Sequence, residues 1–221
     1  MPAALCQQPW MASEVLSGLQ KNYLNKDRDD MDKRELRTKY IAKRRTIPTE
    51  IKQEKSRQIL ERIVELPEYQ NAENILAYAS RKGEVITDEI ILDALSMGKN
   101  VFCPKVTDVE KSEMEFVRID SLEEMSEGAF GIREPEINDS SDVAKELDPE
   151  KTLVIVPGAV FDRQLNRIGY GAGFYDRYLK KYPYYKTVAL CFACQIADEV
   201  IETDINDVKP MMLINENETI R

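Results

Sequence analysis

Histidine is absent from this chain of 221 residues. Its absence excludes a Ser-His-Asp triad, a Cys-His pair and most zinc sites, because all of these depend on imidazole. No apolar run approaches the roughly 20 residues of a membrane helix, so we expect no membrane partner. The formal net charge of −9 argues against a nucleic-acid partner, since phosphate binding needs basic surface. An anionic ligand would therefore have to meet a local basic cluster.

Cysteine is also scarce, with four residues in the chain, Cys6, Cys103, Cys191 and Cys194. The last two form a C-x-x-C pattern inside an apolar run that we interpret as a strand. Residues i and i+3 of a strand face opposite sides, so the two thiols would diverge. No second pair is present to complete a metal site. We interpret these cysteines as small buried hydrophobic residues in a reducing cytosol. The acidic charge and the lack of a recognisable targeting segment favour the cytoplasm.

Apolar patterns that alternate between strand and helix periods dominate the chain from residue 32 onward. We expect helices at residues 32–46, 49–66, 88–97 and 174–182, and strands at residues 74–80, 100–106, 114–119, 152–157, 187–192 and 211–214. This alternation predicts one α/β domain over residues 32–221, with three α/β/α layers and a largely parallel central sheet. Residues 1–31 are polar, and we interpret them as a flexible N-terminal extension, with Met31 as an alternative start.

Capping residues set two of the expected helix boundaries. Thr87 can cap the helix that begins at residue 88, and Gly98 can end it. Ser121 and Glu124 have the spacing of a capping box and predict a short helix that stops at Gly128.

Three of the nine glycines fall within five positions, at Gly169, Gly171 and Gly173. Glycine loses more backbone freedom on folding than other residues, so such a cluster suggests that something approaches the backbone. The cluster follows the apolar strand at 152–157, and ligands of α/β sheets lie beyond the carboxyl ends of strands. Phe174 stands where a G-x-G-x-x-G motif would have its last glycine, and the G-K-[ST] ending of a P-loop is missing.

Charged side chains flank this glycine cluster. Arg167 offers a planar fork for phosphate oxygens, and the helix that opens near Phe174 directs free N–H groups to the same region. Asp176 could complement the helix N-terminus or bind a hard cation such as Mg²⁺. A tight turn without a ligand remains the alternative. Lys33 and Arg37 share one helix face, and on their own they favour a solvated charged surface.

Residues 156–179, VPGAVFDRQLNRIGYGAGFYDRYL, resemble the motif P-G-x-x-F-D…R-L-G-x-G-x-G-Y-Y-D of the 5-formyltetrahydrofolate cyclo-ligase family, also called methenyltetrahydrofolate synthetases. The segments KRELR (33–37), EYQ (68–70), CPKV (103–106) and FGIREP (130–135) also resemble the family, in the same order. The resemblance covers about residues 32–215. It implies the three-layer fold that sugar-phosphate isomerases and CoA transferases share.

The resemblance implies an enzyme that converts 5-formyltetrahydrofolate and ATP to 5,10-methenyltetrahydrofolate, ADP and phosphate, with Mg²⁺, through a phosphorylated formyl group. It implies a monomer or homodimer whose partners are ATP and a reduced folate. The implied ATP site consists of Lys33, Arg37, Arg167, Ile168, Gly169, Tyr170, Gly171, Ala172, Gly173, Phe174 and Tyr175. The implied folate site consists of Arg81, Ile86, Phe130 and Tyr170. The implied metal ligands are Asp176 and Asp207.

Two positions depart from the family pattern. Ile86 stands where the family has the second acid of E-x-[ED]-T, and Met211 replaces an aspartate four residues after Asp207. An apolar residue in a polar site removes a partner that the ligand needs. Two alternatives therefore stay open: a divergent relative that uses the same ATP site for another small molecule, and a non-catalytic domain that senses a phosphorylated metabolite.

Overall fold

The computed structural model describes residues 33–221, so the expected extension at residues 1–31 lies outside the described part. The chain divides into two units, residues 1–36 and residues 37–221. Of the first unit the structure describes residues 33–36, which are helical, and the elements below belong to the second. Within the described residues, no helix is both long and apolar enough to cross a bilayer.

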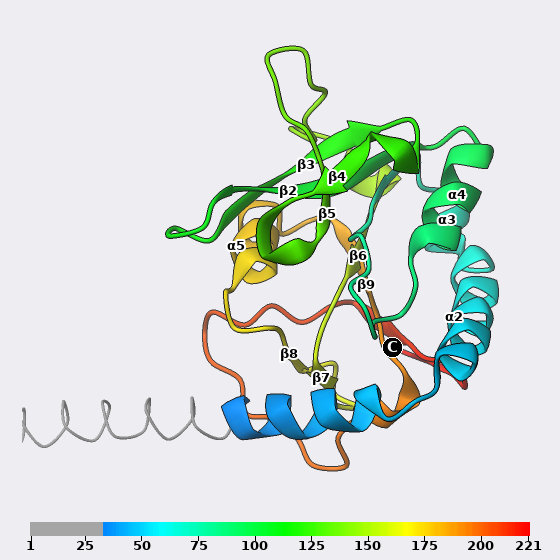
Figure 1. Cartoon of the computed structure of the whole chain (residues 1–221), viewed down its shortest axis with the longest axis vertical. Helices are drawn as coiled ribbons and strands as arrows, with labels where there is room; N and C mark the ends of the chain where they lie inside the picture. Colours follow the sequence, from blue (N-terminus) through cyan, green and yellow to red (C-terminus); the bar gives the residue numbers. More distant parts are fainter. Residues whose placement is uncertain (1–32) are drawn as a thin grey trace, which may run out of the picture. The chain divides into compact units, whose positions relative to one another are not determined.

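A seven-stranded sheet forms the centre of the second unit (Figure 1). The strand order is β11-β10-β9-β6-β1-β2-β3. The strands are β1 (Asn74–Leu76), β2 (Asn100–Asp108), β3 (Glu113–Ile119), β6 (Thr152–Val156), β9 (Lys186–Leu190), β10 (Met212–Ile214) and β11 (Thr219–Ile220). The pairs from β10 to β2 are parallel, and β3 and β11 are antiparallel edge strands. The prediction of a largely parallel sheet is confirmed.

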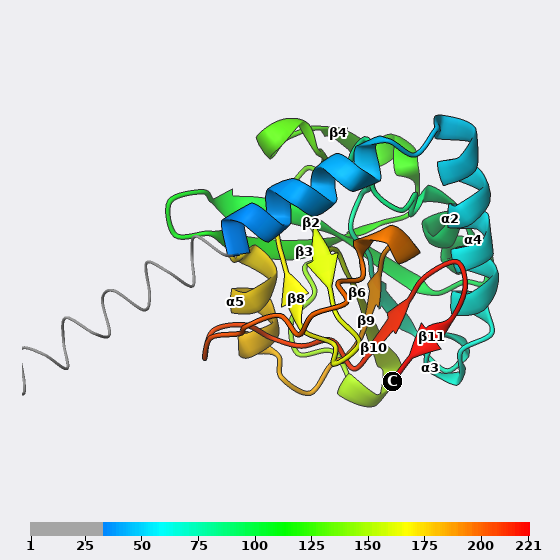
Figure 2. The same cartoon turned by 90° about the horizontal axis from the view of Figure 1, so that it is seen from below.

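The burial of strand β6 shows that both faces of the sheet are covered. All five of its residues are buried, and successive side chains point to opposite faces. Leu153 and Ile155 pack in one core cluster, and Val154 and Val156 pack in the other. The first cluster includes residues of α2 (Thr49–Val64), α3 (Pro67–Gln70) and α4 (Asp88–Ser96), and the second includes residues of α5 (Phe174–Lys181). Figures 1 and 2 show α5 across the sheet from α2 and α4, which confirms the three layers.

The order of the strands reverses between β1 and β6. From β1 the chain proceeds outward to β2 and β3, whereas from β6 it proceeds in the other direction to β9 and β10. Asn74 of β1 lies opposite Thr152 of β6 and Leu76 lies opposite Val154, so the strands start side by side and β6 extends two residues further. A crevice at the carboxyl ends of two such strands is the usual ligand site of an open α/β sheet. Leu76 and Val156, the last residues of β1 and β6, therefore mark where a ligand is expected.

Two small hairpins lie outside the main sheet: β4 (Met125–Glu127) with β5 (Arg133–Pro135), and β7 (Val160–Phe161) with β8 (Arg167–Ile168). The β4–β5 hairpin includes residues for which the sequence predicted a helix that stops at Gly128, so this prediction is wrong. Ser121 caps only a 3₁₀ turn, η1 (Leu122–Glu124), where its hydroxyl accepts the N–H of Glu123 at 3.2 Å. The chain then pairs with β5, so strand pairing replaces the second helical turn.

The expected strand at residues 74–80 ends at Leu76, and Thr87 does not cap α4 with its side chain. The Thr87 hydroxyl instead donates to the carbonyl of Tyr78 at 2.6 Å and accepts the N–H of Ser80 at 3.1 Å. These bonds tie the segment after β1 to the start of α4. Gly98, with φ of +72°, follows the end of α4 as predicted.

The strand interpretation of the C-x-x-C segment is wrong beyond Leu190, because Cys194 lies in a 3₁₀ turn, η4 (Ala193–Gln195). The expectation that the thiols of Cys191 and Cys194 diverge still holds. Cys103, Cys191 and Cys194 are free thiols, and the last two pack on different core clusters. Burial raises the pKa of the Cys191 thiol, so this group stays protonated.

The outer edge of β3 is covered by a loop. Arg118 N–H donates to the carbonyl of Asp142, and Ala144 N–H donates to the carbonyl of Phe116, both at 2.8 Å. At the other edge, β11 is only two residues long. Both edges of the sheet therefore present few free backbone groups.

Candidate functional site

The connection from β6 to α5 begins with a tightly packed glycine. A Cβ atom on Gly158 would lie 2.4 Å from the ring of Phe161, which is fully buried. No side chain fits there without moving the ring. The spacing of Gly158 and Phe161 therefore has a packing cause.

Asp162 organises the turn between β7 and β8. One of its carboxylate oxygens accepts the backbone N–H groups of Gln164 at 2.8 Å and Asn166 at 2.9 Å. The other accepts the side-chain amide of Asn166 and the N–H of Ile201, both at 2.7 Å. Asp162 is 2% exposed, so these bonds replace its hydration. The role of this aspartate in the motif is structural.

Arg167 and Asp176, predicted as a phosphate ligand and a metal ligand, lie against each other. The guanidinium of Arg167 is buried, and it donates to Asp176 Oδ1 at 2.5 Å and to the carbonyl of Pro157 at 3.2 Å. The same Oδ1 accepts the N–H of Val208 at 3.1 Å, next to Asp207. The fold thus joins the start of the loop, helix α5 and the Asp207 segment, which are far apart in the sequence.

Two glycines in the loop need the left-handed backbone region. Gly171 has φ of +106° and Gly173 has φ of +75°, where side chains are strained. The Nε of Arg37 donates to the carbonyl of Gly169 at 2.8 Å, and its guanidinium carbon would lie 3.6 Å from a Cβ on Gly171. Arg37 therefore lies against the loop, as the phosphate-site prediction requires. Lys33 belongs to the first unit, and its contact with phosphate stays a prediction.

Arg44 is a buried cation that the sequence reading missed. It is 6% exposed, its Nη1 donates to the hydroxyl of Tyr170 at 2.7 Å, and it lies 5.8 Å from the centre of that ring. Its Nε has no hydrogen-bond partner among the described residues. Since buried polar groups are normally paired, this N–H is a group that a ligand could satisfy.

A small pocket lies where β1 and β6 end. Its lining comes from five separate segments: Arg44, Tyr78, Glu84, Val85, Pro157, Gly158, Tyr170, Leu190 and Gln195. The space between these residues is too small to hold a water molecule, so a ligand would enter only if their side chains move apart. The strand order predicts a crevice at this position.

The pocket contains one buried carboxylate, that of Glu84, and two phenols, those of Tyr78 and Tyr170. Glu84 is 5% exposed, and its carboxylate accepts the N–H of Arg81 at 2.8 Å. Burial, and then the negative charge of Glu84, raise the pKa of Tyr170 above its usual value. Tyr170 is therefore a neutral hydrogen-bond donor through the physiological pH range.

Of the four expected folate residues, Tyr170 lines the pocket, whereas Arg81, Ile86 and Phe130 lie outside its lining. The guanidinium of Arg81 is 3.5 Å from the carbonyl of Phe130, and the ring of Phe130 lies edge-on to that of Phe174 at 6.1 Å. Phe130 is 54% exposed with φ of +59°, so its ring is not a core residue. Ile86 is half-buried, and its N–H donates to Ser56 Oγ at 3.0 Å. It follows the pocket residues Glu84 and Val85 without lining the pocket itself.

Among the described residues, no group of three or more acidic, cysteine or histidine side chains could form a metal site by itself. Asp176 and Asp207 instead fit the type of Mg²⁺ site that has one or two carboxylates and is completed by substrate phosphates and water. Asp207 lies beside Val208, whose N–H binds Asp176, and one Asp207 oxygen accepts the N–H of Asp204 at 2.9 Å.

Helical spacing could have identified Arg44, because it follows Arg37 by seven residues and so lies on the same helix face. The family resemblance also marks Glu84, as the first acid of E-x-[ED]-T, and Gln195, which follows the segment ALCF. No sequence pattern indicates that they meet.

These features define a three-layer α/β protein with a polar pocket and a glycine-rich loop at the switch point of its sheet. Residues 29–215 match the model of the 5-formyltetrahydrofolate cyclo-ligase family, and the chain belongs to this family of enzymes.

Known proteins similar to this chain carry related names. A probable 5-formyltetrahydrofolate cyclo-ligase of Schizosaccharomyces pombe is 34% identical over 175 residues, which cover 74% of this chain and 84% of that protein. The 5-formyltetrahydrofolate cyclo-ligase of Mus musculus is 32% identical over 190 residues, which cover 80% and 90%. The structure of a 5,10-methenyltetrahydrofolate synthetase from Aquifex aeolicus matches with a TM-score of 0.72 at 29% identity, over 86% of this chain and 92% of that one.

Proposed function

We propose that this protein uses ATP and Mg²⁺ to convert 5-formyltetrahydrofolate to 5,10-methenyltetrahydrofolate, with release of ADP and phosphate. One observation carries the proposal. Tyr170 belongs to the glycine loop and also lines the pocket at the switch point, so two ligands bound at these places would meet. Family membership supplies the substrate class.

The loop suits a triphosphate. Gly171 and Gly173 allow backbone N–H groups to turn outward, and α5 begins directly after them with its positive dipole end. Arg37 lies against this loop and adds positive charge. Asp176 and Asp207 would hold Mg²⁺ together with phosphate oxygens, and the metal would neutralise charge on the phosphates.

The reaction needs positioning more than proton transfer. The formyl oxygen attacks the γ-phosphorus of ATP, and the bond to ADP breaks. N10 of the folate then attacks the activated formyl carbon, N10 loses its proton, and phosphate leaves with the former formyl oxygen. The guanidinium groups of Arg37 and Arg167 stabilise charge on the moving phosphoryl group.

The pocket suits the polar ring of a reduced folate. Arg44 and Tyr170 donate hydrogen bonds, and Glu84 accepts them. Arg81 and Phe130 form an outer wall, where an exposed aromatic ring can stack on a flat ligand. Because Ile86 replaces an acid of the family pattern, Glu84 is the carboxylate that remains in this segment.

An assay of the purified protein with 5-formyltetrahydrofolate and Mg-ATP tests the proposal, since methenyltetrahydrofolate absorbs in the near ultraviolet. We expect product only when both ATP and Mg²⁺ are present. ATP binding without folate turnover would favour another substrate for the same nucleotide site. Failure to bind ATP or ADP would favour a non-catalytic sensor. A cytoplasmic location and a monomeric or dimeric state stay predictions.

A further inference from the structure

A short turn behind the pocket carries Gln195, which is 1% exposed. The Oε1 atom of its amide accepts the N–H of Phe192 at 3.0 Å. The Nε2 atom donates to the carbonyl of Gly158 at 3.0 Å and to that of Ala159 at 3.1 Å. Both ends of the amide are therefore occupied by main-chain groups, one within the turn and one at the start of the β6–α5 connection.

The carbonyl of Gly158 links this amide to the pocket. It also accepts the hydroxyl of Tyr170 at 3.4 Å, and Gly158, Tyr170 and Gln195 all line the pocket. A further hydrogen bond holds the turn against the same connection: Ala197 N–H donates to the carbonyl of Phe161 at 2.7 Å. Gln195 thus fixes the backbone at the point where the glycine loop departs from the sheet.

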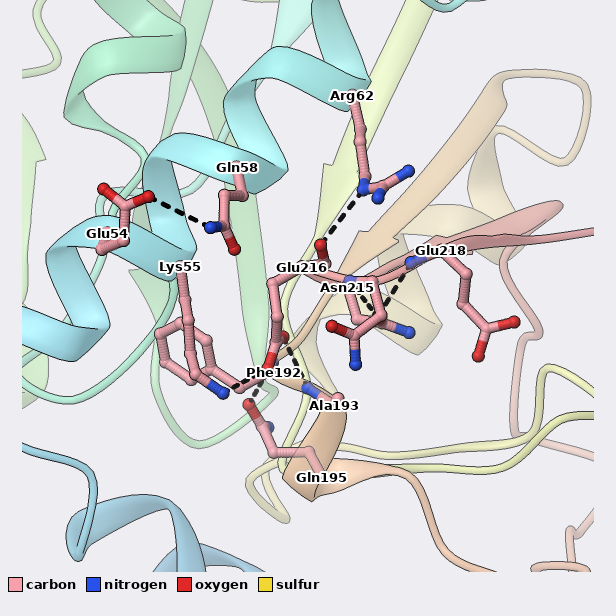
Figure 3. A network of polar contacts seen from close by, with 11 residues as sticks. Glu54, Lys55, Gln58, Arg62, Phe192, Ala193, Gln195, Asn215, Glu216 and Glu218 are labelled. Carbon is pink, nitrogen blue, oxygen red and sulfur yellow. Dashed lines mark hydrogen bonds and ion pairs between the residues drawn. The ribbon is translucent and has the colours of Figure 1, made fainter.

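Glu216 holds the turn from the opposite side (Figure 3). Its side chain is 4% exposed, one carboxylate oxygen accepts the N–H of Ala193 at 2.8 Å, and the other is paired with Lys55 of α2. Its backbone carbonyl accepts Nε of Arg62, also on α2, at 3.3 Å. The carboxylate therefore joins the C-terminal hairpin, helix α2 and the turn of Gln195.

We propose that Gln195 is a positioning residue that fixes the Gly158 carbonyl and with it the Tyr170 side of the pocket, and that Glu216 holds the turn in place. Neither side chain needs to touch a reacting atom. Gln195 acts through Gly158, and Glu216 acts through Ala193. The kinetic consequences rest on the proposed cyclo-ligase function, whereas the effect on the backbone does not.

The variant Gln195→Glu tests this with a near-isosteric change. It keeps the acceptor for Phe192 and places an oxygen against two carbonyl oxygens. Hydrogen exchange, followed by mass spectrometry, should become faster in peptides that cover residues 157–173 and stay unchanged in peptides from α4. A small displacement at a reacting site costs up to roughly 100-fold in rate, so we expect kcat to fall by about 10-fold or more. The KM values for ATP and folate should change by less than about 3-fold.

Gln70→Glu is the matched control, because the exposed amide of Gln70 also donates to a backbone carbonyl, that of Val64 at 3.2 Å. This control should leave kcat and the exchange of residues 157–173 unchanged. Should Gln195→Glu not fold, Gln195→Met removes the same donor without adding charge. The proposal is overturned if the folded Gln195 variant exchanges like the wild type in residues 157–173, or if kcat falls only in proportion to the folded fraction.

A second pair of variants tests Glu216. Glu216→Met should speed exchange in peptides that cover residues 192–197 and lower kcat, whereas Glu218→Met removes a surface ion pair with Arg163 and should do neither. Unchanged exchange in Glu216→Met would refute its part of the proposal. If the wild type has no cyclo-ligase activity, the exchange results still decide the positioning role, so the two failures are distinguishable.

Discussion

At the scale of single residues, the pocket depends on Arg44, a buried cation whose Nε–H has no partner in the part of the chain that the structure describes. We expect Arg44→Met to lower kcat/KM for the folate by about 10- to 100-fold, since one hydrogen bond to a charged group is worth roughly 1.5–3 kcal/mol. ATP affinity should change little, because Arg44 lies on the pocket side of Tyr170. Steady-state kinetics measure kcat/KM for the folate, and calorimetric titration measures the ATP affinity.

The neighbouring Arg45 provides the control for this prediction. It is exposed and sits one position further along the same helix, so Arg45→Met should keep normal kinetics. Equal losses of kcat/KM in Arg44→Met and Arg45→Met would show that the loss of a positive charge, and not the position of Arg44 in the pocket, causes the effect.

Asp162 belongs to the family motif, but its role is to stabilise the fold. Asp162→Asn replaces one of two acceptor oxygens with a donor, which would then face N–H groups. Leaving buried donors unpaired costs about 1–3 kcal/mol each, so urea unfolding should show a loss of stability of at least this size. Asp139→Asn, at an exposed position, should cost nothing measurable. A stable Asp162→Asn protein with impaired turnover would instead indicate a role in chemistry.

At the scale of structural elements, the glycine loop and the end of α4 offer a matched comparison. Gly171 and Gly98 both have positive φ values, of +106° and +72°, but only Gly171 lies in the candidate site. Alanine at either position should destabilise the protein by about 1 kcal/mol through backbone strain. Only Gly171→Ala should also weaken ATP binding, because the loop must change its path.

Thermal unfolding and ATP titration of both alanine variants test this comparison. Normal ATP binding by a folded Gly171→Ala protein would argue that the loop backbone does not meet phosphate.

The elements that the sequence predicted correctly are those with a strong local pattern. β6 is a continuous apolar run because both of its faces are buried, and α5 follows directly after Gly173. The hairpins β4–β5 and β7–β8 were missed because their strands are two or three residues long and their pairing depends on tertiary contacts. The Ser121 capping pattern was misleading for the same reason, since pairing with β5 overrides the local helix signal.

The site was predictable only in part. The motif indicated the loop, and the resemblance implied Arg37, Asp176 and Asp207 as its partners. Arg37 and Asp176 do contact residues of this loop, whereas the ligand roles of all three stay predictions. The pocket could not be predicted, because it combines residues from near positions 44, 84, 158, 170 and 195, and only the fold brings these together. The ion pair between Arg167 and Asp176 was also unforeseen, although the two residues are only nine positions apart.

At the scale of the whole molecule, buried tyrosines contribute to the way stability depends on alkaline pH. Burial raises the pKa values of Tyr78, Tyr170 and Tyr175 above the usual 10.0. The folded state therefore keeps protons that the unfolded state loses above pH 10. Stability from these groups is fully present below that pH and falls as pH rises further, by up to roughly 1.4 kcal/mol per pH unit for each tyrosine.

Urea unfolding at about pH 8 and about pH 11 measures this decline. We expect the free energy of unfolding to fall less between these two pH values in Tyr170→Phe than in the wild type, because the variant lacks one group that titrates. An identical pH dependence in both proteins would contradict the assignment of Tyr170 as a group that stays neutral.

The two edges of the central sheet have a consequence for behaviour at high concentration. An open edge strand is a template on which a second chain can add its own strand, and this is a common start of aggregation. Here residues 142–144 already occupy the β3 side, and the two residues of β11 offer too short a template on the other. The folded protein should therefore resist fibril formation, and aggregation should begin only after one of these edges opens.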